Sequence, residues 1–310
     1  MKKISIIVPV LNEEKVIEQF HKTLSDELKK INNYQFDIKY VLDKSKDKTK
    51  EIIKKIVSQS KNTTLISLSK RFGHQISLLA GIDYSLNSDA VIMLDSDLQH
   101  PPSEIINLIK LYEEGFNIVN TSRVDKSKKT FFSNLFSALF YKFYRLLTSN
   151  EIKNFSADFR LTSKKVNEII SKNYREKNIF LRGIVNTIGF NQVYHFYNVG
   201  ERYAGKSKYN ILEKFKFAFK GIISFGPRPL YLLSLLSLIL FFIGALFVLV
   251  NFNFFVDNII YFFVFYFFIL IFQLTMTGIY LGALYEENKN RPLYIVEELI
   301  EKKKINNIID

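Results

Sequence analysis

The sequence predicts an α/β domain with a mostly parallel sheet, followed by a two-helix transmembrane hairpin. In the first part of the chain, four short apolar segments alternate with segments that have the hydrophobic period of amphipathic helices. Near the other end, residues 229–284 contain a single charged residue, Asp257, in 56 positions. The overall hydrophobic content of 48% therefore averages a charged body and a strongly apolar tail.

Each of the four predicted units consists of a β-strand and the helix that follows it. The predicted strands cover residues 4–10, 38–43, 65–68 and 90–94, and the predicted helices cover 13–30, 47–58, 73–86 and 102–114. Asn12 is expected to cap the first helix, because its side chain can accept a hydrogen bond from a free backbone amide. In parallel sheets of this kind, ligands bind beyond the carboxyl ends of the strands, so polar residues there are the candidates for a site.

Asp95 and Asp97 follow the fourth predicted strand and are the candidate metal ligands. Two carboxylates can hold Mg²⁺ or Mn²⁺ when a diphosphate supplies further oxygen ligands. A solvated turn would give the same Asp-x-Asp pattern, but its position at a strand end, in a chain of net charge +13, favours a metal. The chain has no Cys, which excludes disulfides, a thiolate zinc site and a cysteine nucleophile. His74 and His100 adjoin motifs without metal-ligand spacing and are interpreted as loop histidines.

The apolar tail contains two segments that are long enough to cross a membrane. Residues 230–250 carry no charge over 21 positions, which is ~32 Å of helix against ~30 Å of hydrocarbon, and residues 259–284 continue this pattern over 26 positions. A buried hairpin in a soluble protein is the alternative, but neither segment has a polar face.

The flanking charges predict how the protein is oriented in the cell membrane. Residues 251–258 lack Lys and Arg, whereas basic residues flank both apolar segments, so the positive-inside rule predicts a multi-pass protein with a cytoplasmic body and cytoplasmic termini. No signal peptide is expected, because the first apolar run has only eight residues.

Six motifs resemble, in the same order, the family 2 glycosyltransferases that act on polyprenyl phosphates. They are ISIIVPVLNEE at 4–14, VLDKSKDKT at 41–49, LSKRFGHQISLLAG at 68–81, LDSDLQHPP at 94–102, SADFRL at 156–161 and RYAGKSKY at 202–209. The most similar subgroup is the bacterial undecaprenyl-phosphate glycosyltransferases, relatives of dolichyl-phosphate mannose synthase with two C-terminal transmembrane helices. RPLYIV at 291–296 also fits, so the resemblance covers nearly the whole chain.

The resemblance implies a Rossmann-like nucleotide-sugar-binding domain of the GT-A type. It implies inverting transfer of a sugar from a nucleotide-diphosphate-sugar donor to undecaprenyl phosphate at the cytosolic membrane face, with Mg²⁺ or Mn²⁺ held by Asp95 and Asp97. The catalytic residues that it implies are Asp97, Asp158 and Arg202. The substrate-binding residues that it implies are Pro9, Glu13, Val41, Asp43, Asp95, Gln99, Arg123, Arg202 and Lys208.

The chain departs from the family pattern at one motif. The family usually has Asp-Asp-Gly-Ser where this chain has Leu42, Asp43, Lys44 and Ser45. Lys cannot adopt a positive φ as cheaply as Gly, so the fit of the nucleoside depends on the backbone at Lys44. That lysine is interpreted either as an exposed side chain or as a contact to donor phosphate.

The role of Asp158 stays open at the level of sequence. The resemblance favours a general base, but a phosphate monoester has a second pKa of ~6 and is already anionic near neutral pH, so the demand for a base is modest. Asp158 could instead orient the sugar or the acceptor. A structural ion pair with Arg160 is a further alternative, because residues two apart in a strand point to the same side.

Two basic segments carry most of the positive charge. Residues 123–150 and residues 201–228 each have a net charge of +5. Apolar residues at spacings of three and four predict an amphipathic helix near 130–149, which lies either in the lipid headgroups or against the sheet. Both segments are expected to face an anionic leaflet, and no nucleic acid is expected, because no nucleic-acid-binding module is present.

The predicted organisation is a cytosolic domain at 1–228, two transmembrane helices within 229–285 and a cytosolic tail at 286–310. A homo-oligomer is compatible with the Phe-rich spans. A processive polysaccharide synthase is one alternative, but its Gln-x-x-Arg-Trp motif cannot occur in a chain without Trp. A catalytically silent anchor or partner subunit is the other, and the intact Asp95, Asp97 and Asp158 argue against it.

Overall fold

The computed structural model describes residues 1–124, 156–198 and 227–302, which fall into two compact units. The first unit contains 1–124, 156–198 and 292–302, and the second contains 227–291. Most of both basic segments, with the helix expected near 130–149, lies outside the described residues.

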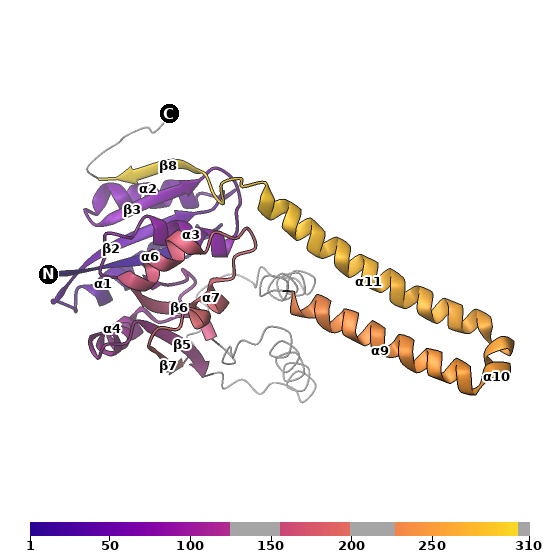
Figure 1. Ribbon diagram of the computed structural model, residues 1–310. Helices are drawn as coiled ribbons and strands as arrows, with labels where there is room; N and C mark the ends of the chain where they lie inside the picture. Colours follow the sequence, from indigo (N-terminus) through magenta and orange to yellow (C-terminus); the bar gives the residue numbers. More distant parts are fainter. Residues whose placement is uncertain (125–155, 199–226, 303–310) are drawn as a thin grey trace. The chain divides into compact units, whose positions relative to one another are not determined.

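An eight-stranded mixed sheet forms the centre of the first unit, with the strand order β7-β5-β6-β4-β1-β2-β3-β8 (Figure 1). The strands are β1 Lys2–Val10, β2 Tyr34–Leu42, β3 Thr63–Leu68, β4 Ala90–Met93, β5 Ile118–Val124, β6 Ser156–Ser163, β7 Gln192–Asn198 and β8 Val296–Glu301. Strands β1 to β4 are parallel to one another, and β6 runs antiparallel to both of its neighbours, β4 and β5. The predicted fold class and its four parallel strands are therefore confirmed.

Helices cover both faces of this sheet. They are α1 Ile17–Leu28, α2 Thr49–Gln59, α3 His74–Asp83, the 3-10 helix η1 Pro102–Glu104, α4 Ile105–Glu113, α6 Lys164–Asn173 and α7 Leu181–Thr187. Residues of α1, α2 and α4 pack into one hydrophobic cluster with one set of strand side chains. Residues of α3, α6 and α7 pack into a second cluster with the alternate side chains of the same strands. The strands are continuous apolar runs because both of their faces are buried.

The start of the first helix differs from the prediction. Helix α1 begins at Ile17, with Val16 at the cap position, and not directly after Asn12. Asn12 has a φ of 51°, and its side-chain oxygen accepts a hydrogen bond from the Lys46 amide at 2.8 Å. The predicted capping role of Asn12 was wrong, because its side chain instead joins the β1–α1 loop to the loop that follows β2.

The chain after the apolar tail returns to the sheet, where the sequence predicts only a cytosolic tail. Strand β8 pairs antiparallel with the edge of β3. The Tyr294 hydroxyl donates to Asp83 at 2.6 Å, and the Lys54 ammonium donates to Glu298 at 2.8 Å. Residues 292–302 therefore complete the first unit rather than forming a separate tail.

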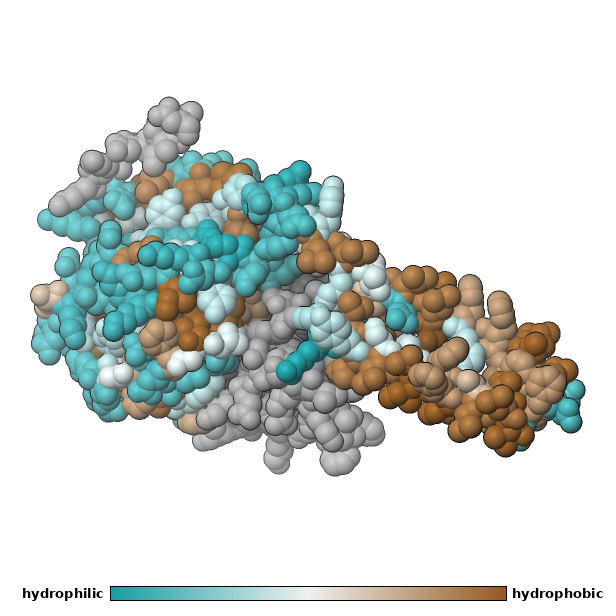
Figure 2. Space-filling view, in the orientation of Figure 1, coloured by the Kyte–Doolittle hydropathy of each residue, from teal (hydrophilic) through white to brown (hydrophobic). Residues whose placement is uncertain are grey.

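The second unit contains the apolar helices. They are α9 Arg228–Val250, α10 Phe252–Asp257 and α11 Ile259–Asn288. Helices α9 and α11 are long and apolar enough to cross a membrane, and Figure 2 shows large apolar side chains along the surface of this unit. Phe242, for example, is 63% exposed.

A close approach between α9 and α11 occurs at Gly244. The Tyr266 hydroxyl of α11 donates a hydrogen bond to the Leu240 carbonyl of α9 at 3.1 Å. A Cβ atom at Gly244 would lie 1.5 Å from that hydroxyl oxygen. Glycine at this position therefore permits both the approach and the hydrogen bond.

The exchange Gly244→Leu is expected to destabilise the helix pair. The new side chain must displace Tyr266, and overpacking of this kind typically costs about 1–3 kcal/mol. Thermal unfolding of the full chain in detergent should show a lower midpoint. Gly278→Leu is the matched control, because a Cβ at Gly278 meets nothing within 4 Å. Equal midpoints for the two variants would contradict this account of the pair.

Candidate active site

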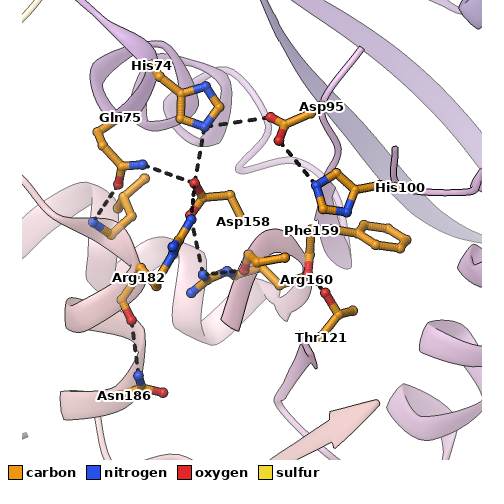
Figure 3. A network of polar contacts seen from close by, with 12 residues as sticks. His74, Gln75, Asp95, His100, Thr121, Asp158, Phe159, Arg160, Arg182 and Asn186 are labelled. Carbon is orange, nitrogen blue, oxygen red and sulfur yellow. Dashed lines mark hydrogen bonds and ion pairs between the residues drawn. The ribbon is translucent and has the colours of Figure 1, made fainter. Parts of the chain in front are cut away.

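Two carboxylates meet at the carboxyl ends of the parallel strands. Asp95 follows β4, and Asp158 lies near the start of β6. Because β6 runs antiparallel to β4 with Met93 opposite Arg160, the same register continued by two residues sets Asp158 opposite Asp95. Figure 3 shows that both side chains contact His74.

His74 lies between these two carboxylates. Its Nε2 atom is 3.3 Å from Oδ2 of Asp158 and 3.7 Å from Oδ1 of Asp95. Burial alone would lower the pKa of His74, but the hydrogen bond with Asp158 and the negative charges of Asp95 and Asp158 outweigh it and raise the pKa to about 8. The imidazole therefore carries a positive charge at neutral pH.

Several hydrogen-bond donors contact the Asp158 carboxylate. Arg182 donates to it from Nη2 at 2.8 Å and from Nε at 3.3 Å, and Gln75 donates from Nε2 at 3.4 Å. Burial would raise the pKa of Asp158, but Arg182, His74 and Arg160 outweigh burial and hold the pKa well below its usual range. Asp158 is thus an ionised carboxylate whose two oxygens are both engaged by the protein.

The ion pair between Asp158 and Arg160 that the sequence suggested is present. Nη2 of Arg160 lies 3.5 Å from Oδ1 of Asp158 and donates to the Ala157 carbonyl at 2.9 Å. Arg160 is only 1% exposed, and its burial lowers its pKa to about 10 although Asp158 opposes the shift. A buried guanidinium of this kind needs a counter-ion, so Asp158 has a structural role whatever else it does.

His100 lies against Asp95 on the side away from His74. Nε2 of His100 lies 3.3 Å from Oδ2 of Asp95 and 2.9 Å from Nη2 of Arg123. Nδ1 of His100 hydrogen-bonds the Tyr197 hydroxyl, and the ring is completely buried against Phe159. Burial opposes ionisation of Asp95, but His100 and His74 keep its pKa below the ordinary value.

The backbone beyond Asp95 forms a tight turn. Oδ1 of Asp97 accepts a hydrogen bond from the Gln99 amide at 3.1 Å, and the intervening Leu98 has a φ of 60°. A positive φ is unusual for leucine and is the kind of strain that clusters at functional sites. The turn therefore fixes Asp97 beside Asp95.

Asp95 and Asp97 fit a divalent cation that shares its ligands with a substrate. Among the described residues, no group of three or more Asp, Glu, His or Cys could hold a metal by itself. Mg²⁺ is commonly bound by one or two carboxylates together with water and substrate phosphates, and both carboxylates here are partly exposed. The donor set is therefore suited to a metal that binds with a diphosphate.

Asp43, expected at the nucleoside, holds a loop in this structure. It is 3% exposed, and its two oxygens accept the amides of Phe72 and Gly73, each at 2.8 Å. Its neighbour Lys44 is exposed, and the positive φ values of non-glycine residues in the described chain occur elsewhere, at Asn12, Leu98 and Asn290. The turn therefore does not require the glycine that the family usually has there.

Other residues that were predicted to bind the substrates lie at the ends of the same strands or outside the described residues. Pro9 and Val41 are neighbours on β1 and β2, and Val41 is completely buried, so any contact with a substrate would come from its main chain. Glu13 is partly exposed, and its amide donates to the Thr49 hydroxyl at 2.8 Å. Arg202 and Lys208 lie outside the described residues.

Sequence reasoning missed three members of this site. His74 and His100 were interpreted as loop histidines, but both contact Asp95, and Arg182 was not considered although it makes the closest contacts to Asp158. The adjacency of the two histidines to motifs was the available signal. Arg182 carried none, because it is 24 residues from Asp158 in the chain.

Residues 5–170 match the family described as Glycosyl transferase family 2. The uncharacterized glycosyltransferase YkcC of Bacillus subtilis is 34% identical over 97% of this chain and 96% of the relative. The bactoprenol glucosyl transferase of Shigella phage SfV is 32% identical over 97% of this chain and 100% of the relative. Among solved structures, mannosyl-3-phosphoglycerate synthase from Rubrobacter xylanophilus is 12% identical, covers 71% of each chain and has a TM-score of 0.48.

The exchange Asp43→Asn is expected to destabilise the first unit without any substrate present. One oxygen that now accepts a backbone amide would become a donor facing that amide, and an unsatisfied buried group costs about 1–3 kcal/mol. Chemical unfolding and amide exchange at Phe72 and Gly73 measure the effect. Asp26→Asn, which breaks an exposed pair with Lys29, is the control and should stay within about 0.5 kcal/mol. If hydrogen exchange at the Phe72 and Gly73 amides is unchanged, Asp43 does not hold this loop.

Proposed function

The chain belongs to glycosyl transferase family 2 and is a glycosyltransferase, and from this premise we propose that it transfers a sugar from a nucleotide-diphosphate-sugar to a polyprenyl phosphate, with inversion at the anomeric carbon. The observation that carries the proposal is that Asp95 and Asp158 lie on two sides of His74. The same chain also has two helices of membrane-spanning length. A relative named bactoprenol glucosyl transferase supports a polyprenyl acceptor, with undecaprenyl phosphate as the first candidate.

On the donor side, negative charge builds on the departing nucleoside diphosphate. Asp95 and Asp97 would hold Mg²⁺ or Mn²⁺, which supplies the neutralising charge when it is bound. His100 and His74 lie on two sides of Asp95. In this proposal the nucleoside contacts Pro9, Glu13, Val41 and the region of Asp43, the sugar contacts Gln99, and Arg123 faces the donor phosphates.

On the acceptor side, the nucleophile is a phosphate oxygen that is already ionised near neutral pH, since its second pKa is ~6. Attack on the anomeric carbon therefore does not depend on proton removal. Asp158, whose pKa is held well below its usual range, is a weak base and acts here as the counter-ion that orients Arg182 and His74. Arg202 and Lys208 are proposed to contact the phosphate groups.

The order of the chain supports a hairpin that enters and leaves the membrane on one side. Strands β1 to β7 precede α9, and β8 follows α11, yet β8 pairs with β3 in the same sheet. If α9 and α11 both cross the bilayer, the two crossings return the chain to the side of the sheet. With Arg228, Lys289 and Arg291 at the ends of the hairpin and no basic residue in 251–258, that side is the cytoplasm.

A transfer assay tests the reaction. Purified full chain with Mg²⁺ or Mn²⁺, undecaprenyl phosphate and a panel of labelled nucleotide sugars is expected to move label into the lipid phase, with an anomeric configuration opposite to that of the donor. Asp95→Asn and Asp97→Asn should each lower the rate by about 10²-fold or more, because charge stabilisation of the leaving group is lost. Asp26→Asn is the surface control. No transfer from any donor would refute the proposed reaction.

Cysteine labelling tests the topology, because the natural chain has no Cys. Asn253 is exposed in the connection between α9 and α11, and Lys61 and Lys302 are exposed in the first unit. Each is replaced by Cys in a separate variant. A membrane-impermeant maleimide should label Asn253→Cys in intact cells and the other two variants only after lysis. Labelling of Lys61→Cys in intact cells is the contrary outcome.

A further inference from the structure

The segment 72–75, which leads into α3, contacts the ends of three strands. The amides of Phe72 and Gly73 donate to Asp43 beyond β2. His74, the first residue of α3, lies against Asp95 beyond β4 and Asp158 on β6. The position of this one segment is therefore tied to both carboxylates of the candidate site.

Gln75 extends the same contacts to α7. Its Nε2 donates to Asp158 at 3.4 Å, and its Oε1 accepts the amide of Leu181 at 2.9 Å. The next residue after Leu181 is Arg182, which donates to Asp158 twice. The adjacent residues His74 and Gln75 thus both reach Asp158 directly, and Gln75 also holds the backbone that carries Arg182 (Figure 3).

The Nε2 atom of His74 is the atom that lies near both carboxylates. A single Nε2–H group can point fully at only one acceptor, and the shorter distance of 3.3 Å marks Asp158 as that acceptor. Asp95, at 3.7 Å, is attracted without a hydrogen bond of normal length. The imidazole therefore stands between two like charges that would otherwise repel each other across the site.

Resting on the proposed function, we propose that His74 is a positioning residue, which holds Asp158 and Asp95 at a fixed separation and so sets the approach of the acceptor phosphate to the donor. It acts through the two carboxylates and neither ligates the metal nor accepts a proton from a substrate. Without the imidazole, Asp158 would lose a hydrogen-bond partner and Asp95 would lose the ring that lies 3.7 Å from it. Binding of the metal by Asp95 would then be as strong as before or stronger, while transfer would be slower.

The experiment compares His74→Ala and His74→Gln with the wild-type full chain. The Gln side chain carries an amide nitrogen near the place of the imidazole Nε2, so it is the conservative variant. His195→Ala is the matched control, because His195 also pairs with a carboxylate, Glu104 at 2.8 Å, but does not contact Asp95 or Asp158. The measurements are kcat, the KM of each substrate, the Kd of Mn²⁺ from the electron spin resonance of free Mn²⁺ with nucleoside diphosphate present, and the midpoint of thermal unfolding.

The expected result for His74→Ala is a fall in kcat of ~10–100-fold, because displacing a reacting group by about 1 Å costs up to ~10²-fold in rate. The KM of the nucleotide sugar should stay unchanged, the Kd of Mn²⁺ should be unchanged or lower, and His74→Gln should recover part of kcat. His195→Ala should retain the wild-type kcat.

Three outcomes would overturn the positioning role. A higher Kd of Mn²⁺ in His74→Ala would mean that the slower transfer comes from loss of the metal and not from the separation of the carboxylates, and a wild-type kcat in that variant would remove the role altogether. If the midpoint of thermal unfolding falls so far that the smaller folded fraction accounts for the loss of kcat, the role of His74 is only structural. Failure of the proposed reaction is distinct from these, because it appears in the wild type as absence of transfer to the lipid phosphate.

Discussion

The antiparallel pairing of β6 with β4 is the constraint on which the candidate site depends. In an all-parallel sheet, a residue near the start of a strand lies at the edge opposite to the carboxyl ends of its neighbours. Because β6 is reversed, Asp158 near its start reaches the edge where β4 ends at Met93 and Asp95 follows. A slip of one residue in this register would turn Asp158 and Arg160 to the other face of the sheet, and the contacts of Asp158 with His74 and Arg182 would be lost.

This arrangement has an energetic consequence for the buried charges. Arg160 is 1% and Asp158 8% exposed, so neither can regain the water that it lost on folding. Arg160 pairs with Asp158, and Asp158 also accepts from Arg182 and His74. Removal of Asp158 would leave Arg160, Arg182 and His74 without their shared counter-ion, and effects of substitutions within this network are therefore not additive.

The sequence predicted the elements whose signals are local and missed those whose signals are not. Strands β1 to β4 are apolar runs followed by amphipathic helices, and both parts are visible within about 30 residues. Strands β6 and β7 carry Asp158, Arg160 and His195 in place of an apolar run, and three of the six residues of β8 are Glu, so only their neighbours in the sheet identify them as strands. Asp95 and Asp97 were predicted because strand ends mark ligand sites in such folds, whereas Asp158 was predicted from the family resemblance. The contacts of His74 and Arg182 could not be predicted, because they depend on the register of β6 and on the approach of α7.

The electrostatics of the site bear on the proposed class of acceptor. A hydroxyl acceptor must lose a proton as it attacks, which calls for a base with an accessible lone pair and a pKa near neutrality. The groups around Asp158 are poorly suited to this: its own oxygens are engaged by arginine, imidazole and amide donors, and His74, with a pKa of about 8, is protonated at neutral pH. His100 is fully buried between Tyr197, Arg123 and Asp95. A phosphate monoester brings its own negative charge and needs cations more than a base, and a site that holds Arg182 and His74 in place around an ionised Asp158 matches that demand.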